Sequence, residues 1–375
     1  MAWADLAAVA ASAWLALLLV PWRPWRTVER LEADPTAPTR VSLGDVTVLM
    51  PARNEAPVIG RSLGALAAQG PSLAVIVVDD GSSDDTAEVA RGAGLASLSL
   101  IQAPPLPAGW TGKLWALEQG RRVVASPYVL LLDADIALAP GLVATLVEKA
   151  RHDRLALVSL MATPAMSGFW DRWWMPVFIY FFKLLYPFRL ANRHGASMAA
   201  AAGGCLLVAT EALADIGGFG ALRDAVIDDC TLARLIKARG AGGIWIGLSR
   251  SAVMLRATGF AGFWRMVART AFTQLRYSYT LLAVCAAVML LVFVAPVLAI
   301  IMGGGAAQAF GAAALAFMAV SYVPTARFYR QSPLSIPALP VAGIAFLLMT
   351  FTSALWYARG FRSRWKGRDY RRGSA

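Results

Sequence analysis

Long apolar segments lie near both ends of the chain, and shorter alternating patterns lie between them. Residues 6–20 form an unbroken apolar run, and the first basic residues, Arg23 and Arg26, come after it. A secretory signal carries its positive charge before the apolar stretch, so this order predicts an uncleaved anchor with its C-terminal side in the cytoplasm. We place the transmembrane anchor at residues 1–26 and a polar linker at 27–43.

Three apolar runs near the C-terminus are each close to the ~20 residues that a helix needs to cross a bilayer. They cover residues 281–302, 306–323 and 336–357, and three glycines separate the first two. Two prolines near the start of the third run weaken its helical pattern, so a re-entrant segment is an alternative to a third crossing. We therefore predict two to three transmembrane helices in a region at 280–357, followed by a basic tail at 358–375.

The region between these apolar segments has the texture of an α/β domain. Short runs such as VTVLMP, AVIVVDD and YVLLLDAD alternate with helical patterns. Continuous apolar strands separated by helices are typical of a parallel sheet that is covered on both faces. We therefore predict an α/β domain with a mostly parallel sheet at residues 44–257.

Two aromatic segments interrupt that texture. Residues 169–190 and 260–279 mix Trp, Phe and Tyr with Arg and Lys. Aromatic and cationic residues on short apolar helices suit the headgroup layer of a membrane, although packing inside the protein is the simpler alternative. We predict interfacial helices here, the second of them within residues 258–279.

Composition and charge support membrane association and exclude several other classes. Apolar residues make up 58% of the 375 residues, charged residues only 15%, and the net charge is +12. Seven basic residues lie between Arg359 and Arg372, directly after an apolar run, which favours anionic membrane lipid over nucleic acid as the partner. The three cysteines are scattered and there are only two histidines, so neither a disulfide framework nor a zinc site is expected.

Acidic residues stand at or just beyond the ends of three predicted strands, the first of which is followed by Glu55. Asp79 and Asp80 leave the second strand, and Asp133 and Asp135 leave the third. The carboxyl ends of parallel strands are where ligands bind, so Asp79 is a candidate for accepting a hydrogen bond from a nucleobase. Two carboxylates one residue apart suit one hard divalent cation, Mg²⁺ or Mn²⁺, with a substrate diphosphate completing its shell. The following acids, Asp84 and Asp85, are better explained as helix caps.

Three later segments add candidate chemistry. Lys113 opens a predicted helix, where its ammonium can meet a phosphate, although a solvated surface lysine is an equal alternative. Asp228 and Asp229 open another helix, so one can cap it and the other can act as a general base. On the second aromatic segment, Arg276 can neutralise a leaving diphosphate and Tyr277 can stack on a sugar or acceptor.

In this order the motifs resemble those of the family 2 glycosyltransferases, whose catalytic domain has the GT-A fold. The matching segments, between residues 45 and 277, are P-A-R-N-E, D-D-G-S-S-D-D-T, D-A-D, two glycine pairs, D-D-x-x-L and Q-x-R-Y. With the anchor, the W-x-G-K segment and the C-terminal runs, the whole chain resembles the hopanoid-biosynthesis-associated glycosyltransferases. It is similar also to the ceramide glucosyltransferases.

The resemblance implies an inverting, metal-dependent transfer of a sugar from a nucleotide-sugar, usually a UDP-sugar, to a lipid acceptor. The enzyme would be a multi-pass protein of the inner membrane with its catalytic domain in the cytoplasm. Asp79 would contact the base, Asp133 the nucleotide and Asp135 the Mg²⁺ or Mn²⁺ ion, with Asp133 as a second ligand. The residues that these motifs place in the donor site are Pro51, Arg53, Glu55, Asp79, Asp80, Lys113, Asp133 and Tyr277.

The remaining motifs carry the catalytic roles. Asp229 matches the catalytic base beside Asp228, and Gln274 and Arg276 belong to the motif that contacts the diphosphate and acceptor. Asp228 stands where Glu is commoner, which keeps the charge. Tyr277 stands where Trp is commoner, and this altered aromatic argues against processive polymerisation. We further expect Asp79, Asp135 and Asp229 to converge on one pocket.

Two other functions compete with this interpretation. A membrane-anchored oxidoreductase would need G-x-G-x-x-G after the first strand, but the turn there is PARNEAPVIG. The main alternative is an inactive, transferase-like membrane scaffold that binds a nucleotide-sugar or a pathway partner.

Overall fold

The computed structural model describes residues 2–33, 41–223, 225–240, 242–365 and 368–371, with side chains up to residue 360. The chain divides into two compact units. One unit holds Met1–Val28, Met166–Arg189 and Thr258–Arg362, and the other holds Glu29–Ala165, Leu190–Ala257 and Ser363–Ala375. We call them the apolar unit and the sheet unit and describe each by itself.

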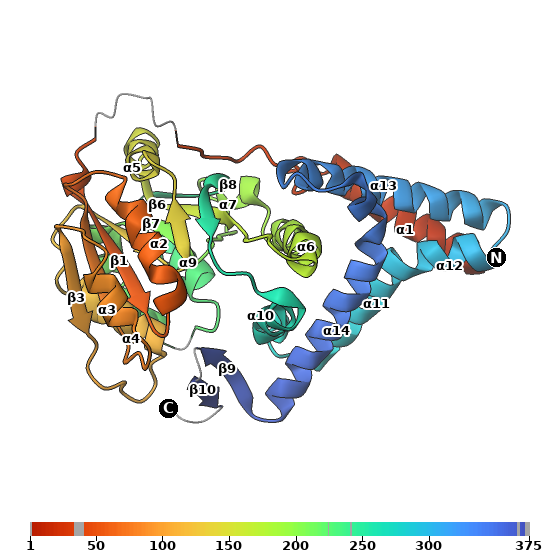
Figure 1. Cartoon of the computed structure of the whole chain (residues 1–375). Coiled ribbons are helices and arrows are strands. Elements are labelled where there is room, and N and C mark those ends of the chain that lie inside the picture. Colours follow the sequence, from red (N-terminus) through yellow and green to blue (C-terminus); the bar gives the residue numbers. More distant parts are fainter. Residues whose placement is uncertain (1, 34–40, 224, 241, 366–367, 372–375) are drawn as a thin grey trace. The chain divides into compact units, whose positions relative to one another are not determined.

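The sheet unit is built on one eight-stranded sheet with the order β3-β2-β1-β4-β7-β6-β8-β5 (Figure 1). Strands β3, β2, β1 and β4 run parallel to one another, and β7 is antiparallel to both β4 and β6. The predicted mostly parallel α/β sheet is thus confirmed. The strands are Val46–Ala52 (β1), Ala74–Asp79 (β2), Leu98–Gln102 (β3), Tyr128–Leu132 (β4), Ile136–Leu138 (β5), Leu155–Thr163 (β6), Cys205–Ala209 (β7) and Gly243–Met254 (β8).

Helices cover both faces of this sheet, which is why its central strands are mostly apolar. On β2, Val75 and Val77 belong to the core cluster that includes Ile59 of α2, whereas Ile76 and Val78 belong to the cluster that includes Leu114 of α4. Successive side chains of a strand point to opposite faces, so a strand buried on both sides needs an unbroken apolar run. The helices of this unit are Ala56–Ala67 (α2), Thr86–Arg91 (α3), Gly112–Arg121 (α4), Leu142–His152 (α5), Thr210–Asp215 (α8) and Asp228–Arg239 (α9).

The start of the predicted linker is attached to the sheet. Leu31 N–H donates to Leu248 O at 3.1 Å, and Leu248 N–H donates to Glu29 O at 2.9 Å. The Glu32 carboxylate accepts from the backbone N–H groups of Arg250 at 2.8 Å and Ser251 at 2.9 Å. Residues 29–32 therefore satisfy backbone groups of β8, while residues 34–40 of the linker lie outside the described residues.

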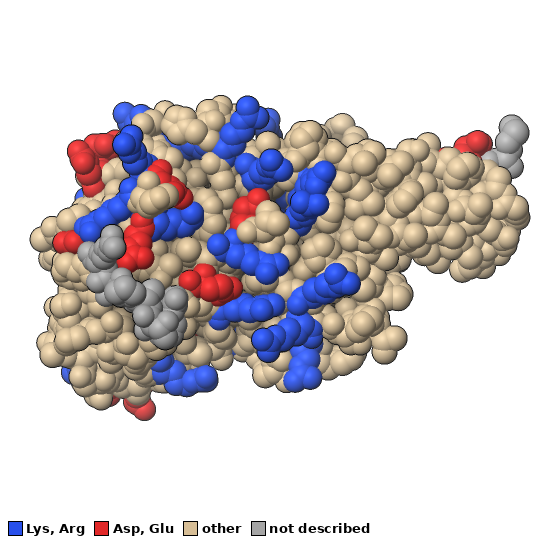
Figure 2. All heavy atoms as spheres, turned by 90° about the horizontal axis from the view of Figure 1, so that it is seen from above, with Lys and Arg blue, Asp and Glu red and all other residues tan. Residues whose placement is uncertain are grey.

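The apolar unit contains four helices that are long and apolar enough to cross a membrane. One lies at the N-terminus and three near the C-terminus, within the predicted range of two to three. On the face shown in Figure 2, α1, α12 and α13 carry almost no charged side chains. The candidate spans are Ala2–Leu19 (α1), Tyr279–Met302 (α11 Tyr279–Met289 and α12 Ala295–Met302), Ala306–Phe328 (α13) and Pro333–Ala358 (containing α14 Leu339–Ala358).

A proline explains how α1 is joined to the second span. Pro296 has no N–H to donate, and the helix widens into a π-helical turn over Leu290–Val294 just before it. The indole N–H of Trp14 on α1 donates to Val292 O at 2.9 Å. This bond supplies the carbonyl four residues before the proline with a donor from another helix, as an apolar environment requires.

The two predicted aromatic helices pack against each other within the apolar unit. They are Phe169–Leu185 (α6) and Gly259–Gln274 (α10), and Trp174 stacks on Phe263 with 5.8 Å between ring centroids. Buried Asp171 of α6 accepts from Thr258 N–H at 3.1 Å, Thr258 Oγ1 at 2.9 Å and Gly259 N–H at 3.0 Å. A carboxylate from one helix thus satisfies the N–H groups that open the other. The proposed position of both helices at a membrane interface stays a prediction.

The remaining elements are short. The side chains of the strands β9 and β10, which carry most of the predicted basic tail, lie outside the described residues. These elements are Phe188–Ala191 (α7), Leu43–Asp45, Gly218–Leu222 and Pro333–Ala338 (3-10 turns), and Phe361–Trp365 (β9) with Arg368–Arg371 (β10).

Candidate functional site

The loops after β1 and β2 lie side by side because the two strands are parallel and Ala52 pairs with Asp79. Arg53 donates from Nη1 to the carbonyl oxygens of Asp80 and Gly81, the latter at 3.0 Å, and its guanidinium lies 3.9 Å from the Asp80 carboxylate. Asn54 accepts from Ser83 N–H at 2.8 Å. The P-A-R-N-E motif therefore holds the D-D-G-S-S loop in place.

Two acids of the second loop, Asp79 and Asp84, are held by hydrogen bonds from the chain itself. Asp79 is 4% exposed and accepts from Ser82 N–H at 3.0 Å. Asp84 accepts from the N–H groups of Ala56 and Thr86, each at 3.2 Å, and so caps the first turns of both α2 and α3. Partial burial acts against its ionisation, but these hydrogen bonds lower the pKa of Asp84. Asp85 occupies the N-cap position of α3, with no hydrogen bond from its side chain to the helix.

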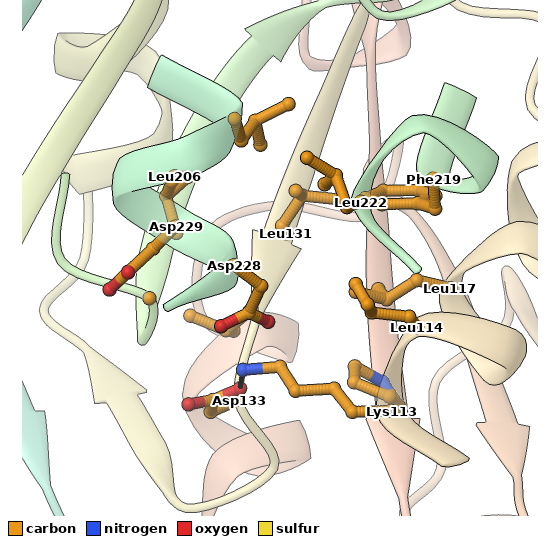
Figure 3. Close-up of a pocket in the computed structure, with 14 residues that line it drawn as sticks. Lys113, Leu114, Leu117, Leu131, Asp133, Leu206, Phe219, Leu222, Asp228 and Asp229 are labelled. Carbon is orange, nitrogen blue, oxygen red and sulfur yellow. Dashed lines mark ion pairs between the residues drawn. The ribbon is translucent and has the colours of Figure 1, made fainter. Parts of the chain in front are cut away.

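The end of β4 brings a carboxylate onto Lys113. Thr111 caps α4 by accepting from Leu114 N–H at 3.4 Å, which places Lys113 in the first turn. Its Nζ lies 2.7 Å from Asp133 Oδ1 (Figure 3). Burial of the ammonium works against its charge, but the carboxylates of Asp133 and Asp228 outweigh this and raise the pKa of Lys113. Lys113 is therefore a charged group in the pocket.

Asp228 and Asp229 form the first turn of α9. Cys230 N–H donates to Asp229 Oδ1 at 2.7 Å, and the backbone of Gly203 hydrogen-bonds to the same carboxylate. A Cβ on Gly203 would lie only 3.2 Å from Asp229 Oδ2, so the glycine permits this close approach. Burial, and then the charge of Asp228, raise the pKa of Asp229 to about 6.

These charged groups line one open pocket of about 360 Å³, including the space that opens to solvent. Figure 3 shows Lys113, Asp133 and Asp228 pointing toward one another from three elements, with Asp229 beside them. Of the three acids that we expected to converge, only Asp229 lines this pocket. The polar and charged lining residues are Lys113, Asp133, Asp228 and Asp229, and the others include Pro51, Gly203 and Phe219.

A basic residue that the sequence reasoning missed lies at the end of β8. Arg256 forms an ion pair through Nη2 with Glu55, which is 6% exposed, and its Nε lies 3.9 Å from Asp135 Oδ2. The only signal in the sequence is a basic residue directly after a strand, which is too common to single out. The pairing of Arg256 with Glu55 joins positions 201 residues apart, so only the fold reveals it.

The second glycine pair has a structural explanation. Gly217 and Gly218 have φ angles of 88° and 67°, and a Cβ on Gly218 would lie 2.6 Å from Arg121 Nε. The buried carboxylate of Glu118 accepts from Phe219 N–H at 3.0 Å and pairs with Arg121. The G-G-F segment thus docks on α4 and holds Phe219 in the pocket wall.

Gln274, Arg276 and Tyr277 lie in the apolar unit, at the end of α10. Gln274 Oε1 accepts from Tyr186 OH at 2.7 Å, and the Tyr277 ring stacks on Tyr357 with 4.3 Å between centroids. Arg276 and Tyr277 have φ angles of 52° and 57°, and Arg276 is exposed. The predicted roles of all three toward the diphosphate and acceptor stay predictions.

The residues expected to hold a metal offer oxygen ligands from a pair of carboxylates. Among the described residues, no group of three or more His, Cys, Asp or Glu side chains is placed to hold an ion. Mg²⁺ in nucleotide sites is usually held by one or two carboxylates together with substrate phosphates. Asp133 and Asp135 fit that pattern, in which a substrate diphosphate would supply further ligands.

Comparisons with known proteins agree with this geometry. Residues 47–217 match the family described as "Glycosyl transferase family 2". A 4,4'-diaponeurosporenoate glycosyltransferase from Staphylococcus aureus is 35% identical over 91 residues, and the aligned part is 24% of this chain and 24% of that protein. The chain thus matches about a quarter of the length of the curated relatives.

One solved structure extends the likeness over nearly the whole chain. It is a mannosyltransferase from Pyrobaculum calidifontis in complex with GDP-Man and Mn²⁺, with a TM-score of 0.55 and 21% identity. The alignment covers 95% of this chain and 99% of that one. The predicted GT-A fold is therefore confirmed, and residues 47–217 are similar to the family 2 glycosyltransferase domain.

Proposed function

We propose that this chain is an inverting, metal-dependent glycosyltransferase that moves a sugar from a nucleotide-sugar to the hydroxyl of a membrane lipid. The observation that carries the proposal is the pocket in which Asp229, with its raised pKa, lies beside the Lys113–Asp133 ion pair. Lys113 and Asp133 lie within residues 47–217, which match the family 2 glycosyltransferases, and the chain also has four helices able to span a membrane.

Asp229 is the group best suited to act as the base. A general base works best when its pKa lies near the operating pH, and burial raises the pKa of Asp229 to about 6. At neutral pH it is then mostly ionised and can take the proton of an incoming hydroxyl. Gly203 and the N–H of Cys230 hold the carboxylate in one orientation. Attack on the face of the sugar opposite the leaving diphosphate gives inversion.

The positive groups of the chain act on the donor. Lys113 is charged and faces the pocket, so it can bind an oxygen of the diphosphate. Arg276 is assigned the same function on the strength of its motif, as a planar guanidinium that can contact two phosphate oxygens. A Mg²⁺ or Mn²⁺ ion held by Asp135 and Asp133 would neutralise charge that develops on the leaving diphosphate. Pro51, Arg53, Glu55, Asp79 and Asp80 complete the proposed donor site.

The lipid acceptor is proposed from the membrane-spanning candidates and from one relative. The Staphylococcus aureus protein is named for diaponeurosporenoate, a lipid-related compound. We propose a hopanoid as the acceptor, a position in the inner membrane with the sheet unit in the cytoplasm, and anionic lipids as partners of the basic residues that begin at Arg359. A UDP-sugar is the proposed donor.

The test is the variant Asp229→Asn, assayed in membranes with radiolabelled donors. UDP-glucose, UDP-N-acetylglucosamine and GDP-mannose are offered in parallel, and the lipid extract is separated to detect a new glycolipid. The matched control is Asp215→Asn, an exposed residue at the end of α8. Loss of transfer in Asp229→Asn, with transfer retained in Asp215→Asn, supports the proposal. Undiminished transfer in Asp229→Asn eliminates Asp229 as the base. Nucleotide binding without transfer, across these donors and added hopanoids, would instead support the transferase-like scaffold.

A further inference from the structure

Each carboxylate of the D-A-D motif faces a cationic side chain of the protein itself. Lys113 Nζ lies 2.7 Å from Asp133 Oδ1, and Arg256 Nε lies 3.9 Å from Asp135 Oδ2. The side chains of Asp133 and Asp135 are only 35% and 21% exposed, so solvent screens these pairs incompletely. Each carboxylate expected to hold a divalent cation therefore already lies beside a positive charge of the protein.

Both cations are fixed in place by the fold. Lys113 is in the first turn of α4, behind the Thr111 cap. Arg256 is anchored by its ion pair with buried Glu55, and its neighbour Leu255 donates a backbone hydrogen bond to Asp135 O at 2.7 Å. The positions of both side chains beside these carboxylates are therefore set by the fold.

The geometry of Arg256 leaves one donor available. Its Nε–H is buried, and no acceptor among the described residues lies within hydrogen-bonding distance. The separation of 3.9 Å from Asp135 is too long for a hydrogen bond. Glu55 thus holds the guanidinium close to Asp135 while its Nε–H makes no hydrogen bond to that carboxylate. A phosphate oxygen could serve as the acceptor for this Nε–H.

We propose that Lys113 and Arg256 are internal counter-ions of the D-A-D carboxylates. When the donor binds, these two cationic side chains pair with its diphosphate instead. A divalent cation alone would lie beside two like charges that repel it. A diphosphate supplies negative charge that attracts both cationic side chains and adds ligands to the ion. The ion and the nucleotide therefore bind together, and each strengthens the other by the same factor. This inference rests on the proposed function and adds the order of binding to it.

The experiment measures Mn²⁺ binding to the full chain in detergent, using electron paramagnetic resonance to count free Mn²⁺. We expect weak binding of Mn²⁺ alone to the wild type and binding about tenfold tighter, or more, with UDP or GDP present. Without nucleotide, Arg256→Gln should bind Mn²⁺ about tenfold tighter than the wild type, since one repulsive charge is gone. In the same variant the strengthening by nucleotide should shrink.

Two further variants keep the inference falsifiable. Glu55→Gln frees Arg256 to bond Asp135 fully, so this variant should bind Mn²⁺ alone several-fold more weakly than the wild type. Arg239→Gln removes the same charge from the far end of α9 and should leave Mn²⁺ binding unchanged. Equal or weaker binding of Mn²⁺ alone to Arg256→Gln, in a variant with an unchanged thermal midpoint, would overturn the inference. Failure of the wild type to bind either nucleotide would overturn the proposed function instead, because the arm without nucleotide does not depend on it.

Discussion

Two sets of carboxylates lie at the same edge of the sheet, and the chain treats them in opposite ways. Asp79 and Asp84 follow β2 and are held by N–H groups of their own and the neighbouring loop. We call them the loop carboxylates. Asp133, Asp228 and Asp229 line the pocket together with the ammonium of Lys113, the one cationic side chain among its described lining residues, and we call these acids the pocket carboxylates.

The pKa values express the difference. Hydrogen bonds lower the pKa of Asp84, whereas burial and a like charge raise that of Asp229. A carboxylate with a lowered pKa stabilises the fold when ionised, and one with a raised pKa weakens the fold when ionised. Asp84 therefore builds structure, and Asp229 holds charge that a substrate can use.

The largest expected effect comes from Asp229→Asn, because activity and stability should change in opposite directions. Loss of the base should lower transfer by about a thousandfold. At pH 8 the ionised carboxylate weakens the fold, since its folded pKa of about 6 lies above the ordinary value of 3.8. The neutral amide should therefore raise the free energy of unfolding by about 1–2 kcal/mol. Thermal unfolding of the full chain in detergent measures this change, and the gain should vanish as the pH falls toward 4.

Asp84→Ala should have the opposite effect on stability. It removes the acceptor for N–H groups that open α2 and α3, so we expect the free energy of unfolding to fall by about 2 kcal/mol. Asp85→Ala, one residue along the chain, should change it by less than about 0.5 kcal/mol because its side chain makes no cap bond. Equal midpoints for the two variants would contradict the distinction between capping and exposed acids.

The stabilisation by Asp84 should decrease as the pH falls, because it depends on the ionised carboxylate. Its folded pKa lies below 3.8, so the contribution is present above pH 4 and is lost as the pH falls below that value. The gap between wild type and Asp84→Ala should accordingly narrow as the pH falls below 4.

The pH dependence of kcat/KM of the wild type tests whether Asp229 must be ionised for activity. Since Asp229 must be ionised to accept a proton, kcat/KM should fall about tenfold per pH unit below pH 6 and level off above it. The profile is measured at saturating acceptor, with Asp215→Asn as the control variant. A flat profile between pH 5 and 7.5 would remove Asp229 from the reaction.

Local pattern was enough to predict much of this fold and part of the site. Apolar runs ending in acids indicated β1, β2 and β4, and the acidic pair before an apolar helix indicated the start of α9. These features depend on neighbouring residues and on the common direction of parallel strands.

The rest depends on contacts between distant residues. Glu55 meets Arg256 across 201 positions, and Phe219 meets Glu118 across 101. Nothing in the local sequence of either partner specifies the other, because many arrangements satisfy a buried charge equally well. For the same reason Asp79 could be expected in the pocket from its place at a strand end, although its carboxylate is buried against Ser82.

The smallest expected effect extends the comparison to the apolar unit, where Asp171 behaves as a loop carboxylate. It is 4% exposed and accepts from two N–H groups and a hydroxyl at the start of α10. Asp171→Asn keeps an acceptor oxygen but removes the charge, so we expect a loss of about 1 kcal/mol in stability, and Asp171→Ala should lose about twice as much. Trp fluorescence during thermal unfolding in detergent provides the measurement, since Trp174 packs on the helix that Asp171 caps. A stability gain in Asp171→Asn, like the one expected for Asp229→Asn, would contradict this expectation. It would show that a buried carboxylate surrounded by donors can still lower the free energy of unfolding.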